Sequence, residues 1–110
     1  MLESARFADA KATFQKVRDS KKDRGAALLG LGHVAFQQGD YPGAAHLARQ
    51  ALDAATDRSE KVGARILAGD ASFKLQRFKD AEREYEAALK LEPGNAGAKR
   101  NLELAKKRLN

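Results

Sequence analysis

A block of sequence that recurs three times constrains this chain more than any other feature. Each copy has a polar residue, an aromatic residue, two further residues and then an alanine, and these alanines are Ala10, Ala44 and Ala81. The first two alanines are 34 positions apart, and the last two are 37 positions apart. A second shared block precedes the later two copies, in which a glycine is followed four residues later by Phe36 or Phe73. Self-similarity at this spacing indicates a repeat protein, in which each repeat packs on its neighbour.

The amino-acid composition indicates that the repeats are helical. The chain has 110 residues and is rich in alanine, leucine, lysine, arginine, glutamate and glutamine, which favour helices. No stretch alternates β-branched and polar residues as a strand does, and Pro42 and Pro93 are the two prolines. We therefore predict an all-α fold. Its six helices are expected at 3–19, 22–38, 41–56, 59–75, 78–91 and 96–109.

Turn residues mark where several of these helices end and begin. Gly39 can adopt a positive φ and end the helix before it. Asp40 is placed to cap the following helix, and Pro42 is tolerated in its first turn. Downstream, the Pro93-Gly94 pair should stop one helix, so that Asn95 caps the next.

Small residues recur where two helices should cross closely. Gly32 and Gly69 occupy equivalent places in the repeat, and so do Ala44 and Ala81. A larger side chain at any of these places would hold the helix axes apart. Glycine inside a helix costs about 1 kcal/mol relative to alanine, so the two glycines indicate a packing requirement. We expect Phe36 and Phe73 to fill the space beside these crossings.

These blocks together resemble the tetratricopeptide repeat family. The shared pattern is a Leu-Gly-like pair, an aromatic, a Gly-Asp-Tyr-like turn, an alanine, an aromatic, an Ala-Leu pair and a proline. The resemblance implies a right-handed α-solenoid of antiparallel helical hairpins, forming one domain over residues 1–110. In this division 3–24 is the second helix of a partial repeat, 25–58 and 62–95 are repeats, and 96–110 is a capping helix.

The second repeat departs from the family pattern at two positions. Ala48 stands where the family favours an aromatic, and Thr56 stands where it favours proline. The three extra residues between the second and third copies lie around 59–61, and we expect them to lengthen the connection between the two repeats.

The resemblance also implies a function, which is to bind a partner protein or peptide in a concave groove without catalysing a reaction. Such a groove would suit a segment with apolar anchors and an acidic residue. We expect Phe36 and Phe73 to belong mainly to the core, although both are also candidates for the groove. The candidate groove residues are Leu29, His33, Phe36, Gln37, Ile66, Asp70, Phe73, Lys74, Arg100, Asn101 and Leu104.

Some family members clamp the acidic C-terminal tail of chaperones with Lys, Asn and Arg side chains at fixed positions. In this chain those positions hold other residues, so we predict that a chaperone tail is not the partner. The residues at the clamp positions are Leu29, His33, Leu67, Gly97 and Asn101.

The N-terminal helix supports an alternative function. Phe7, Phe14 and Val17 form an apolar stripe on the predicted helix 3–19. The first copy lacks the first helix of its hairpin, so part of this stripe should be left uncovered. Either the chain derives from a longer array, or the stripe pairs with a second copy and makes the chain a self-association module.

No arrangement of residues in the sequence predicts catalysis or a cofactor. The chain has no cysteine and two histidines, His33 and His46, whose spacing does not suit a metal site. The glycines near Gly32 lack the Lys-Ser/Thr pair of a phosphate-binding loop. The acids and bases of 80–86 alternate as on a solvated helix face. We therefore predict that the protein is not an enzyme and has no cofactor.

The net charge of +6 favours acidic partners in general. The last predicted helix carries Lys99, Arg100 and the basic run 106–108, but no aromatic residue between them could stack on bases. The sequence thus argues against nucleic acid as the partner. The N-terminus lacks the pattern of a secretory signal, and no apolar run could insert into a membrane. A bacterial assembly or signalling protein in the cytoplasm fits best, with the periplasm as an alternative for a longer exported protein.

Overall fold

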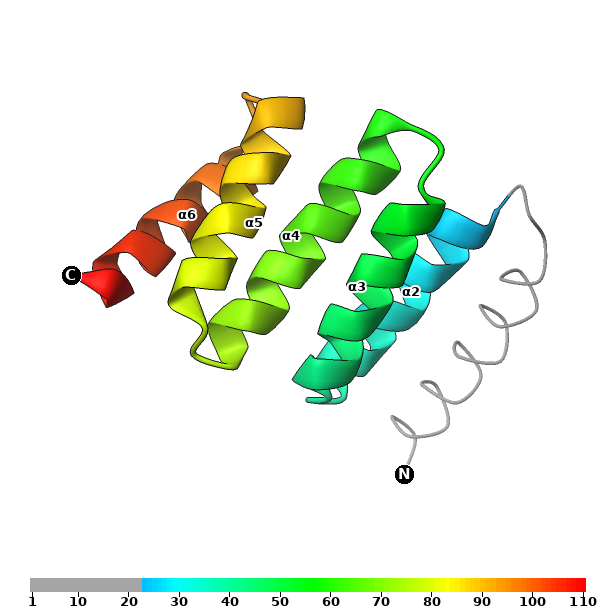
Figure 1. The fold of residues 1–110 in the computed structure, drawn as a ribbon, viewed down its shortest axis with the longest axis horizontal. Helices are drawn as coiled ribbons and strands as arrows, with labels where there is room; N and C mark the ends of the chain where they lie inside the picture. Colours follow the sequence, from blue (N-terminus) through cyan, green and yellow to red (C-terminus); the bar gives the residue numbers. More distant parts are fainter. Residues whose placement is uncertain (1–22) are drawn as a thin grey trace.

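The computed structural model of the chain describes residues 23–110, and all regular structure in this part of the chain is α-helical (Figure 1). In chain order the helices are α2 (Arg24–Gln37), α3 (Tyr41–Ala54), α4 (Arg58–Lys74), α5 (Phe78–Leu91) and α6 (Ala96–Leu109). The all-α fold class is confirmed. The ends of these helices differ from the predicted ends by two residues at most. The predicted helix 3–19, with Phe7, Phe14 and Val17, lies outside the described residues.

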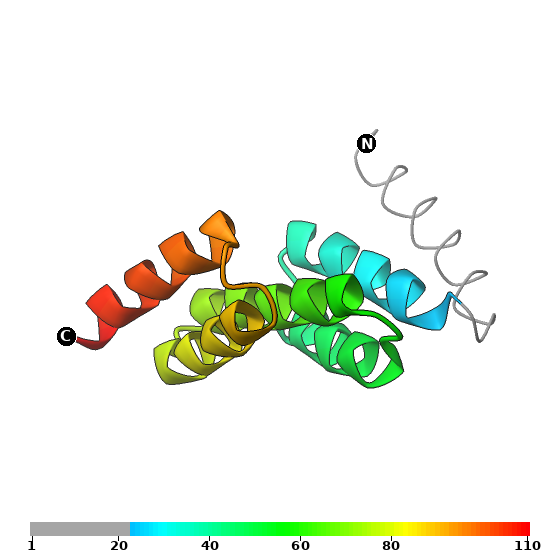
Figure 2. The same cartoon turned by 90° about the horizontal axis from the view of Figure 1, so that it is seen from above.

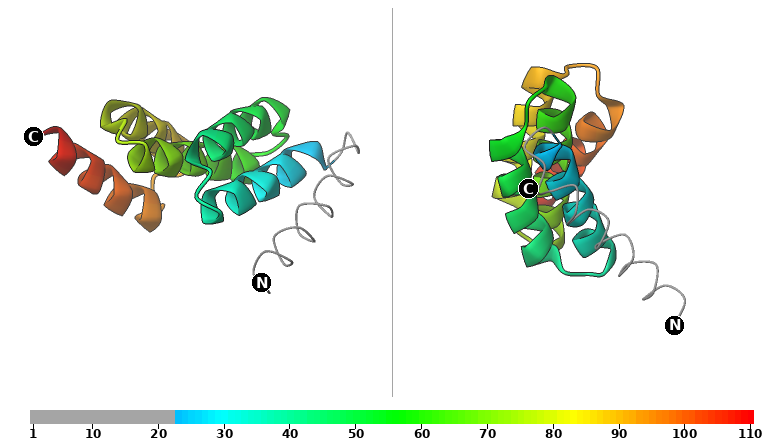
Figure 3. Two further views of the ribbon diagram at one scale, coloured as in Figure 1. Left: turned by 90° about the horizontal axis from the view of Figure 1, so that it is seen from below. Right: turned by 90° about the vertical axis from the view of Figure 1, so that its right-hand side faces the viewer.

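The helices form antiparallel hairpins that stack in one direction, as in an α-solenoid. α2 pairs with α3, α4 pairs with α5, and α6 packs on α5 (Figure 1). Seen from above and from below, α2 and α6 lie on the same side of the layer that α3, α4 and α5 form (Figures 2 and 3). α4 contacts both α2 and α6. The inner surface of the solenoid is therefore bounded by α2, α4 and α6.

The predicted turn residues adopt the predicted roles. Gly39 has a φ of +82° directly after α2. The Asp40 side chain accepts a hydrogen bond of 2.9 Å from the backbone N–H of Gly43 and so caps α3. Asn95 caps α6 in the same way, through a 2.9 Å bond from the backbone N–H of Ala98. Each cap satisfies a backbone donor at a helix start.

The extra residues 59–61 do not lengthen the connection between the repeats, so that prediction is wrong. α4 has 17 residues, whereas α2, α3, α5 and α6 each have 14, and the insertion adds almost one turn to the start of α4. Asp57 begins the helix early by accepting a 2.8 Å hydrogen bond from the N–H of Glu60. The Glu60 carboxylate in turn accepts bonds from the backbone N–H and the hydroxyl of Thr56, both 2.9 Å. The inserted residues are thus good helix starters.

Gly32 in α2 and Gly69 in α4 make room for side chains rather than for a crossing backbone. A Cβ atom on Gly32 would lie 2.6 Å from Leu67 Cδ2, and one on Gly69 would lie 2.6 Å from Tyr85 Cε1. Leu67 and Tyr85 are the two largest side chains that are fully buried among the described residues. The predicted need for small residues at these two positions therefore holds, but the neighbour that creates it is a bulky side chain, from α4 at Gly32 and from α5 at Gly69.

The first prediction concerns Gly69. Gly69→Ala would place a methyl group against the Tyr85 ring, which is 1% exposed and has no free space to enter. We expect the free energy of unfolding to fall by about 1–2 kcal/mol, even though alanine is the better helix former. Urea denaturation measures the change. Gly94→Ala is the control, because nothing lies within 4 Å of its Cβ position. Equal stability of the two variants would contradict the packing account.

The second prediction concerns the ends of the two equivalent helices α2 and α4. Gln76 follows α4 at the place where Gly39 follows α2, and it is held at a φ of +63°. A left-handed backbone strains any residue with a Cβ atom but not glycine. We expect Gln76→Gly to raise the free energy of unfolding by about 0.5–1 kcal/mol, and Gly39→Gln to lower it by a similar amount. Changes of the same sign in both variants, measured by chemical denaturation, would refute this reading.

Candidate functional site

The inner surface holds a hollow of about 270 Å³ where four helices meet. Its apolar walls come from α2, α4 and α6, and its polar residues come from α4, α5 and α6. The lining residues are Phe36, Asp70, Phe73, Lys74, Tyr85, Asn101 and Leu104. All of them except Tyr85 belong to the predicted groove set. We call this hollow the inner hollow.

The walls of the inner hollow are aromatic and aliphatic side chains that the core does not cover. Phe36 and Phe73 are half-buried rather than core residues. Each packs edge to face on the aromatic that opens the next helix, Phe36 on Tyr41 at 5.2 Å between ring centroids and Phe73 on Phe78 at 5.1 Å. These contacts fix the orientation of both rings. Leu104 completes the wall from α6 and is 45% exposed.

The polar floor of the hollow is a hydrogen-bond cluster that links three helices. Asp70 Oδ1 accepts a bond from the hydroxyl of Tyr85 and a 3.1 Å bond from the Asn101 side-chain amide. α4, α5 and α6 are thereby joined at one carboxylate oxygen. No donor among the described residues bonds to the other carboxylate oxygen of Asp70. The floor therefore keeps an acceptor available to a ligand.

Burial sets the protonation behaviour of this cluster. Loss of solvent raises the pKa of Asp70 above its ordinary value of 3.8, although the bonds from Tyr85 and Asn101 and the nearby His33 and Lys74 act in the opposite direction. Burial, followed by the bond to Asp70, raises the pKa of the Tyr85 phenol far above its ordinary value of 10.0. Both effects follow from the cost of holding a charge away from water. Tyr85 thus stays a neutral donor.

The other predicted groove residues do not line the inner hollow. His33, Gln37 and Arg100 are exposed on α2 and α6, and His33 lies near enough to Asp70 to act on its charge. Leu29 packs instead beside Gly63, where a Cβ atom would lie 2.8 Å from Leu29 Cδ2, and Ile66 is half-buried. A role in partner binding remains a prediction for all of these residues.

Tyr85 is the lining residue that the sequence interpretation missed. It occupies the place in the repeat that Ala48 occupies in the previous copy, where the family pattern has an aromatic residue. The same comparison pairs Asp70 with His33, because these residues directly follow Gly69 and Gly32. A buried tyrosine needs a partner for its hydroxyl. The second repeat has His33 and Ala48 at these two positions, whereas the third repeat has Asp70 and Tyr85. The joint appearance of an acceptor and a tyrosine in one repeat is the signal from which the hydrogen bond could have been predicted.

Two further kinds of site are absent from this part of the chain. Among the residues that the structure describes, no group of three or more His, Asp or Glu side chains is arranged to hold a metal ion. No helix within residues 23–110 combines the length and the apolar character needed to cross a membrane.

The Asp70 cluster leads to the third prediction. Asp70→Ala leaves the Tyr85 hydroxyl and the Asn101 amide without their shared acceptor, so we expect it to lower the free energy of unfolding by about 1–3 kcal/mol. Asp70→Asn keeps an oxygen acceptor and should cost much less. Thermal unfolding at neutral pH distinguishes the two variants.

The stability of the wild type and that of Asp70→Asn should also depend differently on pH. Because the folded pKa of Asp70 lies above its unfolded value, the folded state holds this proton more tightly. That contribution to stability is complete below the unfolded pKa and is lost as the pH rises through the folded pKa. We therefore expect the stability of the wild type relative to Asp70→Asn to fall as the pH rises from the unfolded to the folded pKa of Asp70. A relative stability that rises with pH there would contradict the assigned direction.

Comparison with known families agrees with this architecture. A family model described as tetratricopeptide repeat matches residues 2–59, more than half of the chain, and a second model of the same description matches residues 63–95. No curated protein gives a significant match. Tetratricopeptide repeats are generally protein–protein interaction modules, and the family is typically a non-enzymatic scaffold. With both models matched and helical hairpins stacked as a solenoid, the chain belongs to the tetratricopeptide repeat family.

Proposed function

We propose that this chain is a non-enzymatic interaction module that holds a partner polypeptide against the surface of α2, α4 and α6. In this proposal an apolar side chain of the partner enters the inner hollow. The observation that carries it is the construction of the hollow, in which Phe36, Phe73 and Leu104 surround polar groups of Asp70 and Asn101. Apolar walls with a few placed polar groups are typical of binding sites.

The exposure of Leu104 supports this choice of surface. Leu104 and Leu109 are the large hydrophobic residues that are exposed in residues 23–110, at 45% and 42%. Burying a leucine side chain against a partner contributes roughly 1.5–3 kcal/mol when it is complete. Leu104 lines the inner hollow together with Phe36 and Phe73, so a partner side chain that enters the hollow would contact these three residues.

The polar groups around the hollow favour an extended partner with an acidic residue. The free oxygen of Asp70 can accept a bond from a backbone N–H, and the Asn101 side chain offers a further polar group beside it. Lys74 lines the same hollow, and Arg100 is exposed on α6. These two cations would meet a carboxylate of the partner beside the apolar anchor. Self-association through Phe7, Phe14 and Val17 remains a prediction from the sequence.

The fourth prediction tests the inner hollow with two leucines of the same helix. Peptides selected from a random library against the wild-type protein are titrated against Leu104→Asp and Leu109→Asp. We expect Leu104→Asp to weaken binding by about tenfold or more, because a charge would enter the apolar wall. Leu109→Asp should bind as the wild type does.

Both leucines are similarly exposed, so each variant should fold, and a difference between them reports on position rather than on hydrophobicity. Amide chemical shifts of the complex should change in α2, α4 and α6. Equal effects of the two substitutions, or shifts confined to other surfaces, would show that the partner does not use the inner hollow.

A further inference from the structure

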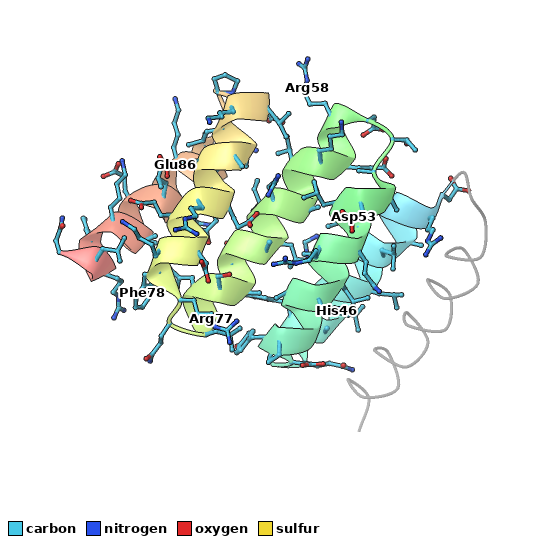
Figure 4. The ribbon with its side chains drawn as sticks, viewed as in Figure 1. His46, Asp53, Arg58, Arg77, Phe78 and Glu86 are labelled. Atoms are coloured by element: carbon cyan, nitrogen blue, oxygen red, sulfur yellow. The ribbon has the colours of Figure 1, made fainter. Side chains whose placement is uncertain are left out.

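A second and larger hollow opens on the other side of α4. It has a volume of about 470 Å³ and is lined by residues of α3, α4, α5 and the turn before α5. Helices α3 and α5 flank α4, but no Cα atom of α3 lies within 8 Å of one in α5. The side of α4 that faces away from α2 and α6 therefore forms the floor of an open channel. Figure 4 views this face of the molecule. We call this hollow the outer channel.

The outer channel is deep because its floor consists of small side chains. Ala64, Ala68 and Ser72 line it from α4, and Ala45 and Ala48 line it from α3. The channel differs in this from the inner hollow, whose walls are two phenylalanines and a leucine. A main chain can approach such a floor closely, whereas a large apolar side chain would find no aromatic wall to pack against.

The sides of the outer channel carry arginine side chains from three helices and a turn. Two of the four arginines already have acidic partners: Arg65 bonds to Glu84 at 3.1 Å, and Arg83 lies 3.9 Å from Asp80. The other two, Arg49 on α3 and Arg77 before α5, have no carboxylate within 4.0 Å among the described residues. Both are exposed. Two guanidinium groups from separate elements thus border one channel without a carboxylate partner in residues 23–110.

Asp53 is the acidic lining residue that belongs to neither of these two pairs, and it lies away from Arg77. Figure 4 places Arg77 at the end of the channel where α5 begins, and Asp53 further along α3 towards the other end. Arg49 precedes Asp53 by four residues on α3, which is one turn nearer to the Arg77 end. Arg49 therefore lies nearer to the Arg77 end of the channel than Asp53 does, and Asp80, in the first turn of α5, is paired with Arg83.

We propose that the outer channel is a second binding site, which takes an acidic peptide segment and pairs its carboxylates with Arg49 and Arg77. The planar guanidinium group matches a carboxylate with two parallel hydrogen bonds. The net charge of +6 steers an anionic segment towards the protein. The residues that line the outer channel include no aromatic side chain on which a nucleic-acid base could stack. These features favour a peptide over a nucleic acid.

The test uses fluorescein-labelled hexaglutamate as the probe and fluorescence anisotropy at low ionic strength as the measurement. We expect the double variant Arg49→Gln/Arg77→Gln to weaken binding by about tenfold or more. The control is Arg24→Gln/Arg58→Gln, which removes the same charge from outside both hollows. Arg58 lies at the far end of α4 in Figure 4, and Arg24 is the first residue of α2. This control should change the affinity less than twofold.

All four arginines are exposed, so neither double variant should disturb the core. Equal losses in the two variants would overturn the proposal, because they would show attraction by net charge alone. No binding of hexaglutamate by the wild type would overturn it too, as would tighter binding of a single-stranded oligothymidine at the same site. Leu104→Asp should leave hexaglutamate binding unchanged, which separates failure of the outer channel from failure of the inner hollow.

Discussion

The packing of Leu67 against Gly32 and of Tyr85 against Gly69 is the constraint on which the rest of the structure depends. A side chain on either glycine would meet the neighbouring side chain at 2.6 Å. Most of the remaining core residues are alanines, and Leu67 and Tyr85 are the largest of the fully buried side chains in residues 23–110. Each glycine costs about 1 kcal/mol of helix propensity, a loss that is offset by burying a leucine or a tyrosine beside it.

The same packing builds the inner hollow. Because Gly69 receives the ring of Tyr85, the phenol reaches across to α4, where its hydroxyl bonds to Asp70. Asn101 then joins α6 to the same carboxylate oxygen. The floor of the hollow is therefore an extension of the core, and the geometry of its polar groups depends on a glycine that does not line it. Side chains that are already held by hydrogen bonds in this way lose little further entropy when a partner binds.

The sequence predicted most of the helices and turns because local rules determine them. Gly39, Asp40 and Asn95 each act through their own backbone or that of a residue three positions away, so pattern and structure agree. The site is different, because its residues come together only through packing. The family resemblance named Asp70, Asn101 and Leu104, but the bond that joins Asp70 to Tyr85 spans 15 positions and two helices. The expectation that residues 59–61 lengthen the connection was wrong because the cap by Asp57 starts α4 before them, so that they extend the helix. The outer channel was not predicted because Arg49 and Arg77 belong to no shared sequence motif. They line the same channel only because α3 and α5 pack on α4 without contacting each other.

The position of α4 determines how the two hollows relate to each other. One side of this helix presents Asp70, Phe73 and Lys74 to the inner hollow, and the other presents Ala68 and Ser72 to the outer channel. A ligand on one side could influence the other only by moving α4 or the side chains packed on it. The helix is held on its two flanks, by Leu67 in the space beside Gly32 and by Tyr85 in the space beside Gly69. Close-packed contacts of this kind resist small displacements. We therefore infer that the bulky side chains that build the core also limit the movement of α4 when either of the two proposed sites is occupied.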